Sequence, residues 1–260
     1  MDTLSYDDVL AALRRTQERL VAALAPLSGD QLAADSYCDD WTIAQVASHM
    51  GSASEIFGGL VEAGLSGGPV PPAESNQAIW DRWNAKAPDQ QAVDAIRAAA
   101  GFIAHVEALT PEQTAAWRLR VYGAERTLAE LLRMRLAEQA VHTWDIVVMA
   151  DPSAALPEDA TALMVDALPM MVGYAGRTAG DSAHIAVSTE QPERAFLLEL
   201  TETGVRLAPG PDSATTAELR LPAEALVRLV YGRLDPEHTP PSVEAKGVEL
   251  DTLRGVFRGF

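Results

Sequence analysis

"RMRLAEQAVHTWDI", residues 133–146, combines helical spacing with three side chains that can bind a metal ion. Glu138, His142 and Asp145 stand at positions i, i+4 and i+7, so on a helix they lie within roughly 60° of one another. Apolar residues share this sector of the predicted helix, namely Leu131, Met134 and Met149. Ionisable groups on an apolar face are costly to bury unless something pairs them, and a divalent cation is one such partner.

A second stretch, "DWTIAQVASHM" (residues 40–50), places His49 in a similar setting. Thr42 and Gln45 form a capping box that begins a helix, and His49 follows on its apolar stripe. Two imidazoles and one carboxylate can bind a divalent cation and leave a coordination position open, as catalytic sites do. Spacing alone also allows His49 to be a hydrogen-bonded core residue and Glu138 and His142 to be an exposed pair. Asp145 could orient a histidine ligand or hold a substrate.

The rest of the pattern predicts a helical domain followed by a small α+β domain. Helical periodicity covers residues 6–27, 42–64, 74–109 with a break at Pro88, 127–149, and 158–174 with an interruption at Pro169. Thr127 and Glu130 form a second capping box, at the start of the helix over 127–149. After about residue 176, short alternating segments predict strands at 184–189, 195–202, 205–209, 217–221 and 242–247, and helices at 222–234 and 251–260. We therefore expect domains over residues 1–175 and 176–260.

The composition of the chain limits which partners, disulfide bonds and cellular location can be expected. A net charge of −17 argues against nucleic acid or an anionic membrane as partner, since both need a basic patch. The single cysteine, Cys38, excludes an internal disulfide framework, and we interpret it as a bystander in a polar loop. The five tryptophans are interpreted as packing anchors. With neither a bilayer-length apolar run nor a signal-peptide pattern, the chain is expected to be cytoplasmic.

The two stretches and the C-terminal part together resemble the mycothiol-dependent maleylpyruvate isomerase family, a branch of the DinB-like metalloenzymes. Residues 40–50 are similar to its first metal-ligand motif and residues 135–146 to its second. "LVRLVYGRLDP" (226–236) and "VEAKGVELDTLRGVFRGF" (243–260) resemble its C-terminal domain. The resemblance implies an α+β protein, with a DinB-like four-helix bundle over residues 1–175 and a sterol-carrier-protein-like domain over residues 176–260.

The resemblance also implies a site. Zinc is the usual metal of the family, and its ligands match His49, Glu138 and His142 in this chain. An acidic partner matches Asp145. An arginine of the C-terminal domain is expected to take part in catalysis; Arg233 in "YGRLDP" is the best match, and Arg228 is the alternative.

These features lead to a functional hypothesis with two rivals. The leading one is a metal-dependent enzyme in which mycothiol attacks an electrophilic substrate, as an S-transferase or as a maleylpyruvate-type cis–trans isomerase. The first rival is a metal-dependent hydrolase, because the same donors suit an activated water. The second is a non-catalytic protein that binds an apolar ligand. The residues specify neither the electrophile nor the oligomeric state.

Overall fold

The computed structural model describes residues 4–178, 182–210 and 215–259. The chain divides into two compact units, Met1–Asp151 and Pro152–Phe260. The last residue of the helix expected at 251–260 lies outside the described residues.

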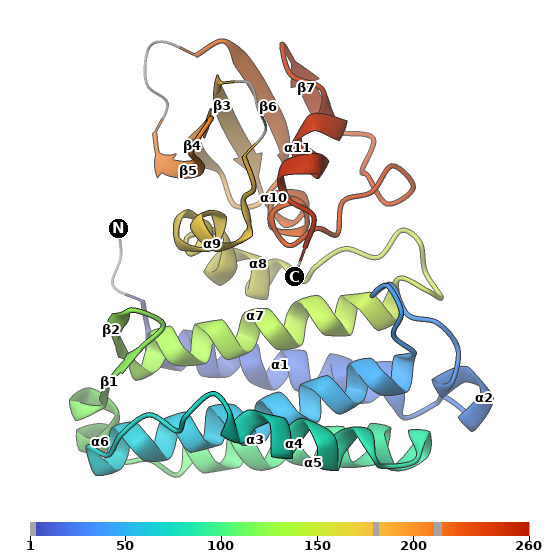
Figure 1. The fold of residues 1–260 in the computed structure, drawn as a ribbon, viewed down its shortest axis with the longest axis vertical. Coiled ribbons are helices and arrows are strands. Elements are labelled where there is room, and N and C mark those ends of the chain that lie inside the picture. The colour runs from blue at the N-terminus through green and yellow to red at the C-terminus, as the bar shows by residue number, and fades with distance from the viewer. Residues whose placement is uncertain (1–3, 179–181, 211–214, 260) are drawn as a thin grey trace. The chain divides into compact units, whose positions relative to one another are not determined.

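Unit 1 is built around four long helices that pack against one another (Figure 1). They are α1 (Tyr6–Leu24), α3 (Ile43–Ser66), α5 (Pro88–Glu107) and α7 (Leu128–Val147). Three shorter helices accompany them: α2 (Gly29–Leu32), α4 (Ser75–Asn84) and α6 (Pro111–Ala116). Each long helix buries an apolar stripe in the bundle, represented by Leu13, Val46, Ala95 and Leu132. The predicted long helices are confirmed, and the break expected at Pro88 separates α4 from α5.

Both capping boxes predicted from the sequence form, and they set the start of the two helices that matter most. The Oγ1 of Thr42 accepts from the backbone N–H of Gln45 at 3.2 Å, and Gln45 Oε1 accepts from the N–H of Thr42 at 2.8 Å. At α7, Thr127 and Glu130 make the same reciprocal pair at 3.3 and 2.7 Å. Each box satisfies backbone donors that a helix start leaves free.

A short hairpin before α7 was not expected from the sequence. Strands β1 (Arg118–Val121) and β2 (Ala124–Thr127) pair antiparallel, with Leu119 and Val121 buried. Its two turn residues, Tyr122 and Gly123, have φ of 50° and 78°, as two-residue hairpin turns require. A four-residue strand with arginines at alternate positions carries too weak a pattern to be recognised from the sequence.

Unit 2 contains a five-stranded sheet in the order β5-β4-β3-β6-β7. The strands are β3 (Ala183–Glu190), β4 (Arg194–Thr201), β5 (Gly204–Pro209), β6 (Ala217–Pro222) and β7 (Glu244–Lys246). Neighbours run antiparallel except β3 and β6, which are parallel. The described residues of this unit also form four helices: α8 (Glu158–Val165), α9 (Leu168–Ala175), α10 (Ala223–Val230) and α11 (Leu250–Val256). The sheet's buried face includes Ile185, Val187 and Leu219.

The division between the units differs from the boundary expected at residue 175. It falls between Asp151 and Pro152, because α8 contacts α10 and α9 contacts β5 and α10. Helical periodicity identifies α8 and α9 as helices, but it does not tell which core they pack against. Among the described residues, no helix is long and apolar enough to cross a membrane.

Candidate metal centre

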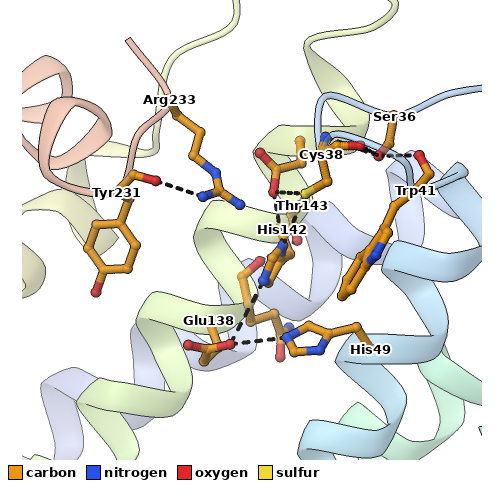
Figure 2. A network of polar contacts seen from close by, with 11 residues as sticks. Ser36, Cys38, Trp41, His49, Glu138, His142, Thr143, Tyr231 and Arg233 are labelled. Atoms are coloured by element: carbon orange, nitrogen blue, oxygen red, sulfur yellow. Dashed lines mark hydrogen bonds and ion pairs between the residues drawn. The ribbon is translucent and has the colours of Figure 1, made fainter. Parts of the chain in front are cut away.

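Three predicted ligands converge between α3 and α7. His49 lies on α3, and Glu138 and His142 lie one turn apart on α7. Nε2 of His49 is 3.3 Å from Oε2 of Glu138, and Nε2 of His142 is 3.8 Å from the same oxygen. Figure 2 shows the three side chains turned toward one another. One ligand atom from each residue lies within 4.8 Å of the other two.

These separations fit a metal ion. A tetrahedral zinc ion with bonds of about 2.0–2.1 Å to nitrogen and oxygen holds its ligand atoms roughly 3.3 Å apart. The separation between Glu138 and His49, 3.3 Å, matches that value, and the separation between Glu138 and His142, 3.8 Å, is longer. The side chains of Glu138 and His49 remain 38% and 28% exposed, so a small molecule can reach the donors. The residues present therefore fit a divalent cation with an open position.

The charge state of Glu138 also suits a metal ligand. Burial raises the pKa of this carboxyl, but the hydrogen bond with His49 and the nearby charges of His142, His49 and Arg135 outweigh burial. The net result lowers the pKa from 4.5 to about 2. Glu138 is thus ionised at neutral pH, as a carboxylate ligand must be.

Asp145 holds His142 from the other side of the ring. Oδ2 of Asp145 is 2.9 Å from Nδ1 of His142, and the Asp145 side chain is fully buried. An ionised carboxylate only accepts hydrogen bonds, so Nδ1 of His142 carries a proton, and in the neutral imidazole that a metal ligand must be, Nε2 keeps the lone pair. That lone pair is the one that faces Glu138. Carboxylates commonly orient metal-ligating histidines in this way.

Two further residues near the centre were not recognised from the sequence. Trp41 was expected to be a packing anchor, but its side chain is exposed and its ring centroid lies 5.4 Å from that of His49 and 6.5 Å from that of His142. Cys38 was expected to be a bystander, but its Sγ lies 3.0 Å from Oδ2 of Asp145. Neither residue belongs to a helix, so the helical repeat of the sequence could not predict that they lie beside the metal-ligand candidates.

The two candidate arginines lie in unit 2, at and just after α10. Arg228 is engaged structurally: it forms an ion pair with Glu224 at 2.7 Å and donates to the carbonyl oxygens of His238 and Arg233. Arg233 is also buried, and its Nη1 donates to the carbonyl oxygen of Tyr231 at 2.6 Å. The three metal-ligand candidates and Asp145 all belong to unit 1.

Family models match nearly the whole chain. The model of the mycothiol maleylpyruvate isomerase N-terminal domain matches residues 13–147, and a model described as the MDMPI C-terminal domain matches residues 155–254. The chain belongs to the mycothiol maleylpyruvate isomerase family. The resemblance inferred from the two motifs is thereby confirmed.

Solved structures show the same fold. Two crystal structures of the mycothiol-dependent maleylpyruvate isomerase, one of them a histidine-to-alanine mutant, each superimpose with a TM-score of 0.68 at 14% sequence identity. Each comparison covers 94% of this chain and 95% of the other. The predicted α+β class, with a helical N-terminal part and a strand-rich C-terminal part, is confirmed. No curated protein sequence matches the chain.

Proposed function

We propose that this chain is a metal-dependent enzyme in which mycothiol attacks an electrophilic substrate. The observation that carries the proposal is the convergence of His49, Glu138 and His142, whose ligand atoms lie within 4.8 Å of one another, with Nε2 of His49 and Oε2 of Glu138 at the spacing of a tetrahedral metal site. Family membership supports the choice of mycothiol as the thiol and of isomerisation as one of the two reactions. We propose zinc as the metal, because two imidazoles and a carboxylate are donors that zinc accepts.

Different residues of the site would bind the metal, orient a ligand and bind the substrate. His49 and His142 would supply neutral nitrogen ligands, and Glu138 an ionised oxygen ligand. A bound divalent cation favours a thiolate over a thiol, which makes the nucleophile available at neutral pH. Asp145 holds the ring of His142, and Trp41 forms an apolar wall beside both imidazoles. We retain Arg233 as the group that would bind a substrate carboxylate, on the strength of its motif.

Two outcomes of thiolate attack remain distinct proposals. If the thiolate displaces a leaving group, the thiol is consumed and the reaction is an S-transfer. If it adds to a cis double bond, rotation about the resulting single bond and expulsion of the thiolate give the trans isomer. The thiol is then recovered unchanged. Measuring free thiol before and after turnover tells the two apart.

The deciding experiment measures metal and turnover on the same purified protein. Elemental analysis by plasma emission should find about one zinc per chain. Turnover of maleylpyruvate, or of a thiol-reactive aryl halide, should require both the metal and mycothiol. His105→Ala is a matched control, because His105 pairs with Glu62 at 2.9 Å on another part of unit 1. Turnover without any thiol would instead favour a hydrolase. A co-purified lipid without turnover would favour a binding protein.

We further propose a cytoplasmic location and small molecules as the only partners needed for turnover. A net charge of −17 disfavours nucleic acid, and a single cysteine suits a reducing compartment. Cell fractionation with an antibody to the chain tests the location.

A further inference from the structure

The loop before α3 is tied firmly to the metal centre. Residues 35–42, which we name the Cys38 loop, are closed at their ends by a β-bridge between Asp35 and Thr42. The N–H and Oγ of Ser36 both donate to the carbonyl oxygen of Trp41, at 2.9 and 2.8 Å. The N–H of Tyr37 donates to the backbone carbonyl of Asp145 at 3.1 Å. These bonds fix the loop internally and anchor it to α7.

The loop directs the thiol of Cys38 at the carboxylate of Asp145, which holds His142. Sγ of Cys38 donates to Oδ2 of Asp145 at 3.0 Å. The same oxygen accepts from Nδ1 of His142 at 2.9 Å, while Sγ and Nδ1 are 3.9 Å apart. One carboxylate oxygen, fully buried, therefore receives two donors from two different segments of unit 1.

The distances favour hydrogen bonds over a second metal ion among these three residues. A tetrahedral zinc ion with a sulfur bond of about 2.3 Å would hold sulfur and oxygen ligands about 3.5 Å apart. The separations observed from Oδ2 of Asp145, 3.0 Å to Sγ of Cys38 and 2.9 Å to Nδ1 of His142, are both shorter than the ligand separations of a zinc ion, and both are hydrogen-bond distances. Glu138 and His49, at 3.3 Å, have the metal-type spacing instead.

We propose that Cys38 is a positioning residue of the metal centre. Its thiol donates to Asp145 and holds the carboxylate in the rotamer that accepts from Nδ1 of His142. Nε2 of His142 is thereby kept free and aimed at the metal position. Asp145 is fully buried, so a substitution that removes the thiol takes one hydrogen-bond donor from a carboxylate oxygen that water does not reach, and the preference for that rotamer weakens. The inference rests on the proposed metal site and assigns a role within it to the only cysteine of the chain.

Three substitutions separate hydrogen bonding from packing. Cys38→Ser keeps a donor, Cys38→Val keeps the bulk without a donor, and Cys38→Ala keeps neither. Chelator competition measures zinc affinity in each. We expect valine and alanine to weaken affinity on the order of 10-fold, the lower end of the effect of losing a hydrogen-bond partner of a metal ligand. Serine should stay within about threefold of the wild type, because its hydroxyl can make the same bond. Ser48→Ala is the control, since Ser48 is buried on α3 and bonds to Asn84 instead.

A second readout does not depend on metal. Nitrogen-15 NMR of the metal-free protein should report the Nδ1–H tautomer for His142 in the wild type and in Cys38→Ser, and a mixture of tautomers in Cys38→Val. Equal zinc affinity and equal tautomer populations across the Cys38 variants would overturn the proposal. So would valine performing as well as serine, because packing alone would then explain the residue.

The proposed function and the proposed role of Cys38 can be refuted separately. A wild-type protein that binds no zinc defeats the proposed function, while the tautomer measurement still tests the bond from Cys38 to Asp145. A wild-type protein that binds zinc with an affinity unaffected by Cys38→Val defeats only the positioning role.

Discussion

Replacing His49 with alanine removes one of the three donors around the proposed metal position. The change also removes the hydrogen bond that helps to lower the pKa of Glu138 to about 2, so the remaining carboxylate holds a proton more readily. Losing a hydrogen-bond partner of a metal ligand costs roughly 10- to 100-fold in affinity, and losing a ligand should cost at least the lower figure. We therefore expect zinc affinity to fall at least 10-fold, or about 1.4 kcal/mol.

Chelator competition followed by plasma emission gives the affinity directly. At the free zinc concentration that half-saturates the wild type, a 10-fold weaker variant would be less than about one-tenth occupied. His105→Ala, which alters a histidine–glutamate pair between α5 and α3, should bind zinc as the wild type does. Wild-type zinc affinity in His49→Ala would refute the assignment of His49 as a ligand. Equal losses in both variants would point to a general loss of structure.

Three further predictions concern stability. Because folding lowers the pKa of Glu138, its ionised carboxylate stabilises the folded protein fully above about pH 4.5, and this stabilisation is lost as the pH falls toward 2. Between pH 4.5 and 2, the melting temperature of metal-free Glu138→Gln should therefore fall less than that of the metal-free wild type. Arg135 is fully buried, and its Nε and Nη1 have no hydrogen-bond partner among the described residues. Arg135→Met should therefore raise the unfolding free energy by about 1 kcal/mol in a urea titration, and a decrease would show that the charge is needed. Gly64→Ala places a Cβ 2.2 Å from the Trp117 ring and should cost about 1–3 kcal/mol, whereas Gly58→Ala, with nothing within 4 Å, should not destabilise.

Local sequence patterns predicted the long helices and their starting residues, because these features depend on residues that are close together in the sequence. The apolar period of 3.6 residues identifies the long helices, because one face of each must be buried. Thr42 with Gln45, and Thr127 with Glu130, marked the starts of α3 and α7. Once the first residue of a helix is known, the direction in which each later side chain faces follows from the helical repeat. For that reason Glu138, His142 and Asp145 were expected on one side of α7.

Other features arise only when separate segments meet. The hairpin before α7 pairs two segments too short to carry a period, and the assignment of α8 and α9 to unit 2 depends on contacts with β5 and α10. Trp41 is exposed beside two imidazoles, although tryptophans are highly buried on average.

The sequence by itself determined where the helices begin, which residues could bind a metal and which family the motifs resemble. It did so because helical geometry converts spacing along the chain into a shared face. Only the tertiary structure decided that His49 meets Glu138 at 3.3 Å and that the thiol of Cys38 reaches Asp145 at 3.0 Å. Those distances depend on how α3, α7 and the Cys38 loop pack, and packing follows from the sum of many contacts rather than from any one motif.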